Sequence, residues 1–292
     1  MSNYKIISDS SCDLTKDLLE KYDIDIIPYY ITFNGVDYFK EGVNISYEEL
    51  YRKMRNEKAY PKTSLPPVQD YIDKFRPYVE KGVDVICVCL TSKFSGAYQC
   101  AITSAGILKE EFPDSKIYVI DSESATIFQG CVLLEIAKMN EKGYPIEKII
   151  EISDAIKKDT AAIFSVDTLE YLQKGGRIGK VAAFAGSLFN IKPIIFLENG
   201  ELLPSNKVMG RKKAINEIME IFEQRVKGKE HLYNFTVACS DAVEEAENMK
   251  AVLEEKGYSF HLPVSSIGAT ITVHAGPGTI AAGYSRKYES FE

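Results

Sequence analysis

Strand-like and helix-like hydrophobic patterns alternate through the first half of the chain. Val83 to Leu90 is a continuous run of β-branched, Leu and Cys residues, broken only by Asp84, and is typical of a strand buried on both faces. Ser46, followed by Glu49 three residues later, forms a capping box that predicts a helix over 47–56. Strands that alternate with helices indicate a parallel sheet with crossover helices. The other expected elements here are strands at 4–7, 25–31 and 117–120, and helices at 14 or 15–22, 68–79, 96–111 and from about 125 to 143–145.

The second half of the chain has a different order of predicted elements, with strands that follow one another directly as well as helices. A helix over 146–158 carries the chain onward, and Asn199-Gly200 then predicts a hairpin turn between two strands. Hairpins mixed with helices indicate an α+β fold. We therefore predict an N-terminal α/β domain of residues 1–160, a C-terminal α+β domain of residues 161–292, and a ligand buried between them. The expected elements of the second domain are strands at 160–166, 191–197, 201–208, 234–240 and 267–273, and helices at 211–226, 242–256 and 279–288.

Composition narrows the class of protein. The chain has 292 residues, of which 45% are hydrophobic and 26% charged, and this is usual for a soluble globular protein. A net charge of -7 without a long basic run argues against nucleic acid as a partner. The sequence shows neither a signal peptide nor an apolar stretch of transmembrane length, so we expect a cytoplasmic protein with at most transient membrane contact. Six cysteines occur without a CxxC pair, so we expect reduced thiols and no metal site.

Thr63 and Ser64 stand just before Pro66-Pro67, which end regular structure locally. Two interpretations are open for these hydroxyls. They cap the helix that begins near Val68, which is the commoner use of Ser and Thr, or they bind a ligand.

Ser95 and Gly96 directly follow the buried strand that ends at Leu90. Ligands gather at the carboxyl ends of parallel strands, and the N–H groups at the start of the next helix attract anions. Ser95 can therefore cap that helix and bind a ligand at once.

His274 precedes Gly276-Pro277-Gly278 and is one of three histidines. We expect it to end a strand, with a helix beginning at Thr279 and glycines that allow close backbone approach. An imidazole in such a place can donate to a carboxylate, which favours a functional role over a structural one. Residues 276–281 also match a dinucleotide pattern, but the chain ends before the acidic ribose partner that this pattern needs.

Residues 174–180 form a glycine-rich segment around Arg177. The segment lacks the glycine spacing of a phosphate-binding loop, and Val181 replaces the required Ser or Thr. We expect either a mobile loop that presents Arg177 to a partner or a phosphate, or a solvated turn. The sequence contains no GxSxG, HExxH or paired-carboxylate motif.

Taken together, these segments resemble the DegV family of bacterial fatty-acid-binding proteins. The matching segments run in order along nearly the whole chain, and they are residues 9–14, 63–66, 92–99, 169–178 and 274–278. The family often has Thr where Ala97 stands and Ser where Gly179 stands, so a secondary hydroxyl is absent here.

The resemblance implies two α/β domains with a long-chain fatty acid, such as palmitate, buried between them. It further implies that Thr63 and Ser95 hydrogen-bond the carboxylate, with His274 nearby, and we add Ser64 and Gly96 as neighbouring contacts. Some members of the family present the bound acid to a separate kinase, which phosphorylates the carboxylate.

Our leading hypothesis is a non-enzymatic carrier of a long-chain fatty acid in lipid transport or fatty acid metabolism, without a cofactor. An alternative is a serine acyl hydrolase with Ser95 as nucleophile and His274 as base. A third is a carrier of another small acid, such as a sugar acid.

Overall fold

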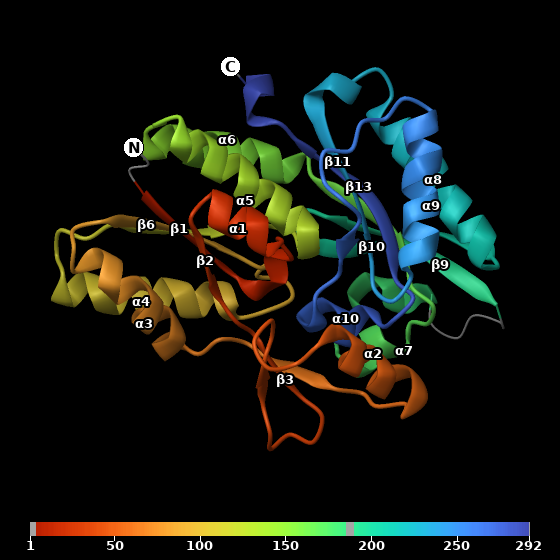
Figure 1. Cartoon of the computed structure of the whole chain (residues 1–292), viewed down its shortest axis with the longest axis horizontal. Helices are drawn as coiled ribbons and strands as arrows, with labels where there is room; N and C mark the ends of the chain where they lie inside the picture. Colours follow the sequence, from red (N-terminus) through yellow and green to blue (C-terminus); the bar gives the residue numbers. More distant parts are fainter. Residues whose placement is uncertain (1–3, 185–189, 292) are drawn as a thin grey trace.

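A parallel sheet forms the N-terminal part of the molecule. The computed structural model describes residues 4–184 and 190–291, and four parallel strands stand there in the order β2-β1-β6-β7 (Figure 1). They confirm the parallel α/β arrangement expected from the first half of the sequence, with β6 as the strand buried on both faces. The strands are β1 (Tyr4–Asp9), β2 (Ile24–Ile27), β6 (Asp84–Cys89) and β7 (Ile117–Asp121).

Helices cover both faces of this sheet. In Figure 1, α3 (Val68–Val79) and α4 (Ala97–Glu111) lie on one face, while α1 (Lys16–Lys21) and α5 (Thr126–Glu141) lie on the other. Next to α5 lies α6 (Ile146–Lys158).

A mixed sheet of six strands in the order β10-β9-β8-β13-β11-β12 forms the C-terminal part. Its pairs are antiparallel except β11 with β12, and the predicted hairpin joins β9 to β10. Helices α8 (Arg211–Val226) and α9 (Val243–Glu255) pack against this sheet through a second hydrophobic cluster. The strands are β8 (Ala161–Ser165), β9 (Ile191–Glu198), β10 (Glu201–Met209), β11 (Tyr233–Cys239), β12 (Ser265–Ser266) and β13 (Ile280–Arg286).

Helix α5 connects the two sheets. Nearly all of its side chains are buried, which is the pattern of a helix surrounded by protein. The Gln129 amide donates to Asp9 Oδ1 of β1 at 3.0 Å. Six positions along the chain from Gln129, the carboxylate of Glu135 accepts from Asn234 Nδ2 of β11, also at 3.0 Å. These bonds set the position of both sheets relative to one helix.

A small third sheet lies at one end of the molecule, with strands β3 (Tyr30–Thr32), β4 (Phe39–Lys40) and β5 (Lys62–Ser64) in the order β4-β3-β5. Beside it in Figure 1 lie α2 (Tyr47–Asn56), α7 (Glu170–Lys174) and α10 (Ala269–Ala275). A hydrophobic cluster joins Ile31, Leu50 and Met54 to Ala269 and Val273, so the C-terminal α10 packs on N-terminal elements. Short 3-10 helices cover Ser10–Cys12, Gly179–Phe184, Glu230–Leu232 and Tyr288–Phe291.

Two predicted elements near the C-terminus are wrong in type. The strand expected over 267–273 is the helix α10, and the helix expected over 279–288 is the strand β13. In both cases tertiary contacts determine the type of element. Side-chain carboxyl groups of residues far away in the sequence accept from N–H groups at the start of α10, and β8 and β11 pair with β13 on its two sides. The single extended run expected over 25–31 is divided between β2 and β3, which belong to different sheets.

Gly283 in β13 leaves no room for a side chain. A Cβ added there would lie 2.3 Å from the carbonyl oxygen of Ala161 and 2.4 Å from a ring carbon of Phe128. We predict that Gly283→Ala lowers the free energy of unfolding by about 1–3 kcal/mol because the sheet or α5 must shift. The matched control is Gly106→Ala in α4, where nothing lies within 4 Å and alanine favours the helix by up to ~1 kcal/mol. Urea unfolding of both variants measures the difference, and equal stability of the two would contradict the tight contact.

Candidate functional site

An apolar cavity of about 250 Å³ lies between the parallel and the mixed sheets. It is lined by residues of the N-terminal part, among them the ends of β5 and β6, and by residues of α5, α10 and the mixed sheet. Its polar side chains come from loops, from a strand end and from the helices α5 and α10. Its apolar wall on the side of α5 and the mixed sheet includes Phe128, Ala162, Phe164, Leu197, Leu202 and Ala281.

Thr63 and His274 meet at this cavity although 211 positions separate them in the sequence. Thr63 lies in β5, where its main chain pairs with Ile31 of β3, and His274 lies in the last turn of α10. The distance from Thr63 Oγ1 to His274 Nε2 is 2.9 Å. The capping role considered for Thr63 and Ser64 is wrong, because Pro67 is the N-cap of α3 and no side chain caps that helix.

Ser95 also lines the cavity, at the start of α4 as expected. Its Oγ accepts a hydrogen bond from the main-chain N–H of Ala97, the first residue of α4, at 3.2 Å, although the N-cap position belongs to Gly96 and not to Ser95. It accepts a second hydrogen bond from the phenol of Tyr29 at 2.8 Å. Of the two neighbouring residues expected at the site, Ser64 lines the cavity, whereas Gly96 is the N-cap of α4 and is not part of the lining.

Arg177 lies at the edge of the cavity, with an exposed side chain. Its guanidinium donates to the carbonyl oxygens of Phe94 at 3.2 Å and of Gly175 at 2.7 Å. The side chain therefore connects the glycine-rich segment to the residue just before Ser95, and it adds a positive charge near His274.

The His274 imidazole is neutral at neutral pH. Burial, together with the charge of Arg177, lowers its pKa from the ordinary 6.5 to about 4. Nδ1 has no hydrogen-bond partner among the described residues, and a buried N–H without a partner is rare. We therefore assign the proton to Nε2, which then donates to Thr63 Oγ1. This assignment leaves the Thr63 hydroxyl proton free for another acceptor.

A close contact with His274 explains why one position of the glycine-rich segment, residue 175, is glycine. A Cβ added at Gly175 would lie 2.2 Å from His274 Nδ1, so only glycine leaves room for the imidazole. The sequence predicted either a mobile loop or a solvated turn here, whereas this glycine is explained by close contact between the end of α7 and α10.

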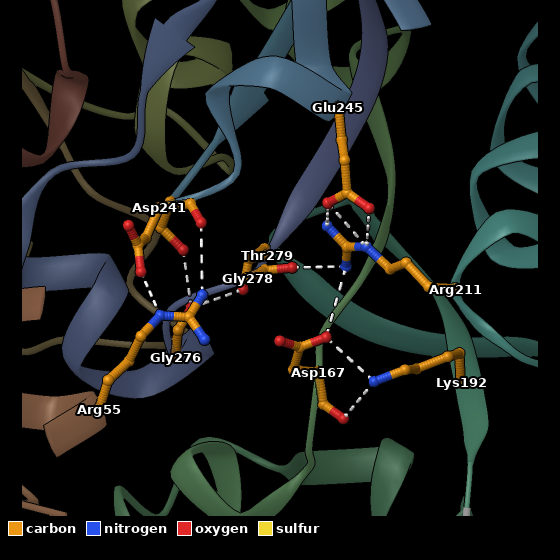
Figure 2. A network of polar contacts seen from close by, with 10 residues as sticks. Arg55, Asp167, Lys192, Arg211, Asp241, Glu245, Gly276, Gly278 and Thr279 are labelled. Carbon is orange, nitrogen blue, oxygen red and sulfur yellow. Dashed lines mark hydrogen bonds and ion pairs between the residues drawn. The ribbon is translucent and has the colours of Figure 1, made fainter. Parts of the chain in front are cut away.

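A polar network holds the loop that follows His274 (Figure 2). Ser240 Oγ donates to the Gly276 carbonyl at 2.7 Å, and Gly278 N–H donates to the Ser240 carbonyl at 2.7 Å. Arg211 donates to the Gly278 carbonyl at 2.6 Å, and Figure 2 shows its guanidinium between Glu245 and Asp167. The strand β13 follows this loop directly, so the helix start expected at Thr279 is wrong.

In the same network, Arg55 of α2 pairs with Asp241, which follows β11. The contact links the N-terminal helix α2 to the segment beside this loop.

Sequence reasoning missed Tyr29, which lines the cavity and is 2% exposed. It lies in the extended run expected over residues 25–31, where no motif indicated a functional residue. Only its contact with Ser95, 66 positions away, indicates a role.

The geometry does not favour the serine hydrolase alternative. Within residues 4–184 and 190–291, no hydrogen bond joins Ser95 to His274. Ser95 is bonded to Tyr29 instead, and His274 to Thr63. His274 Nδ1 also lacks the acidic group that would orient a catalytic base. The described part of the chain holds no cluster of potential metal ligands, and all six cysteines are unpaired. None of the described helices is both long and apolar enough to cross a membrane.

The lowered pKa of His274 predicts a loss of stability in acid. Between about pH 6.5 and 4 the unfolded chain binds a proton at this residue and the folded chain does not, so the free energy of unfolding falls as the pH falls. At 1.36 kcal/mol per pH unit the full effect is about 3 kcal/mol. Chemical unfolding across this range should show a smaller decline in His274→Gln, which cannot titrate. An NMR titration midpoint for His274 at or above 6.5 would contradict the predicted burial effect.

Comparisons with known proteins agree on one family. Residues 3–287 match the family model described as an uncharacterised protein of the DegV family. A DegV domain-containing protein of Staphylococcus aureus is 32% identical over 281 residues, covering 96% of each chain, and one of Clostridium perfringens is 32% identical over 283 residues, covering 97% of this chain and 99% of the relative.

Among solved structures, a stearic-acid-binding protein of Eubacterium ventriosum superposes with a TM-score of 0.94 at 35% identity, covering 98% of this chain and 99% of that one. DegV of Bacillus subtilis, described as a fatty acid binding protein, superposes with a TM-score of 0.87 at 28% identity, covering 98% and 100%. The chain therefore belongs to the DegV family.

Proposed function

We propose that this protein is a non-enzymatic carrier of a long-chain fatty acid whose acyl chain occupies the apolar cavity. The observation that carries the proposal is the cavity itself, whose walls are mostly apolar and whose polar residues include Thr63 and Ser95. The fatty acids bound by the related proteins of E. ventriosum and B. subtilis support the same ligand class.

Burial of the acyl chain supplies most of the binding free energy. A sixteen-carbon acid brings roughly 14 methylenes, and each contributes about 0.8 kcal/mol when buried. The gross gain of about 11 kcal/mol is reduced by the entropy of binding, yet it leaves room for tight association. A sugar acid has no such chain, and the apolar wall formed by Phe128, Phe164 and Leu197 offers it no polar partners.

The carboxylate needs donors because a charge leaves water on binding. We assign this role to the hydroxyls of Thr63 and Ser95, each of which already accepts a bond from a neighbour and so has its proton to donate. His274 acts as a neutral donor to Thr63, while Ser64 and the N–H of Gly96 lie next to these hydroxyls in the sequence. Arg177 lies at the exposed edge of the cavity and is not one of the donors that we assign to the carboxylate.

We further propose that the bound carboxylate is presented to a separate kinase that forms an acyl phosphate, as the resemblance to DegV proteins implies. Arg177 suits this step because a guanidinium binds phosphate oxygens in a bidentate way. We place the carrier in the cytoplasm, where its six unpaired cysteines stay reduced.

The carrier proposal is tested by native mass spectrometry of the purified protein, followed by organic extraction. We expect a co-purifying long-chain acid. A protein that is empty and does not take up a fluorescent acyl chain would refute the carrier, and a short polar ligand would indicate a different acid.

Thr63→Ala combined with Ser95→Ala should weaken palmitate binding by about 1–3 kcal/mol for each lost charge-assisted bond. The fold should survive, because the lost bond from the Ala97 N–H to Ser95 costs only ~1 kcal/mol. Ser92→Ala, in the same loop as Ser95 but outside the cavity lining, is the matched control. Calorimetric titration measures the affinities, and a dissociation constant unchanged in the double variant would move the carboxylate elsewhere.

Arg177→Ala should leave palmitate affinity nearly intact and reduce acyl-phosphate formation by a cognate kinase supplied with ATP. Arg177→Lys retains the charge but not the bidentate geometry, so it should restore the reaction only in part. Acyl-hydroxamate detection measures the product. Normal phosphorylation of the alanine variant would limit Arg177 to its structural bonds with Phe94 and Gly175.

A further inference from the structure

The oxygen of Ser95 has no accepting capacity left for a ligand. A hydroxyl oxygen has two lone pairs, and Ser95 Oγ already accepts from the Tyr29 phenol at 2.8 Å and from the Ala97 N–H at 3.2 Å. Whatever Ser95 binds in the cavity must therefore receive its proton. An acceptor without a proton of its own, such as a carboxylate, suits this oxygen best.

The position of Tyr29 allows its phenol to determine that Ser95 donates to a ligand and does not accept from it. Its ring is 2% exposed, its main-chain N–H donates to Ser10 Oγ at 2.9 Å, and its carbonyl accepts from Glu41 N–H at 2.9 Å. Within the described part of the chain the phenol has Ser95 as its hydrogen-bond partner and no other. Burial raises the pKa of Tyr29 well above its ordinary value, so the phenol keeps its proton and remains the donor.

We propose that Tyr29 is a positioning residue for ligand binding: its phenol occupies the acceptor side of Ser95 and turns the Ser95 proton toward the carboxylate of the bound fatty acid. The inference rests on the proposed carrier function and adds to it a residue that selects the head group. Tyr29 thus favours an ionised acid over a neutral head group, because an alcohol or ester gains no charge-assisted bond from the oriented proton.

The hydroxyl of Thr63 shows a similar arrangement. The His274 Nε2–H donates to Thr63 Oγ1 and leaves the Thr63 proton to be donated. Both hydroxyls at the polar end are therefore prepared as donors by a buried, neutral ring from another segment of the chain.

A double-mutant cycle tests the role of Tyr29. The affinities of the wild type, Tyr29→Phe, Ser95→Ala and the double variant are measured for palmitate and for hexadecanol, which has the same chain and a neutral head group. Tyr29→Phe keeps the ring and removes only the hydroxyl, so we expect about a five- to tenfold loss for palmitate and less than about a twofold change for hexadecanol. In the Ser95→Ala background the same change should have no further effect, because its target is gone.

Tyr30→Phe is the matched control. Tyr30 is the next residue, its phenol donates to Asp70, and it is not among the cavity-lining residues. Its loss should leave both affinities unchanged. Thermal unfolding of each variant checks that the fold is intact.

The outcomes separate this inference from the carrier proposal. A wild type that binds neither ligand refutes the carrier and the role of Tyr29 together. If the wild type binds palmitate, an unchanged affinity in Tyr29→Phe overturns the positioning role alone. Equal losses for palmitate and hexadecanol, or additive losses in the double variant, would also overturn it, because Tyr29 would then act without Ser95.

Discussion

The candidate site depends on two carboxylates that hold the start of α10. Asp13 Oδ2 accepts from the Gly268 N–H at 2.8 Å, and Glu41 accepts from both the N–H and the hydroxyl of Thr270, at 2.8 and 2.6 Å. The first N–H groups of a helix have no partner within the helix, and carboxylates are the groups that bind them best. These bonds fix a helix near the C-terminus to segments more than 220 positions away in the sequence.

His274 reaches Thr63 because α10 is held in this way. The helix is short, so a shift at its first residues would move the imidazole at its last turn. Burial and the charge of Glu41 raise the pKa of Asp13 well above its usual value. The network around Arg211 then holds the loop on the other side of His274 and leads the chain into β13.

The polar end of the cavity offers hydroxyl protons instead of a buried ion pair. Tyr29 and His274 are both neutral rings that donate to a hydroxyl, and the charged Arg177 stays at the exposed edge. A buried ion pair would lose much of its Coulomb energy to desolvation. Oriented neutral donors can stabilise the charge of a bound carboxylate by hydrogen bonds. When the cavity is empty, they leave no unpaired cation behind.

The sequence by itself determined the elements whose local pattern agrees with their surroundings. The continuous apolar run of β6, the cap at Ser46 and the Asn199-Gly200 hairpin were predicted from the residues because burial on both faces, capping and turn geometry are local properties. The resemblance to DegV proteins added the expectation that Thr63 and Ser95 bind a carboxylate with His274 nearby. That expectation and the domain boundary at residue 160 stay predictions. Only the tertiary structure decided the rest. The β-branched residues of α10 favour a strand, but their helix is capped by Asp13 and Glu41, and the small residues of β13 suit a helix until β8 and β11 pair with them. Tyr29 likewise gains its role only where the folded chain brings its phenol to Ser95, because a hydrogen bond across 66 positions leaves no periodic pattern in the sequence.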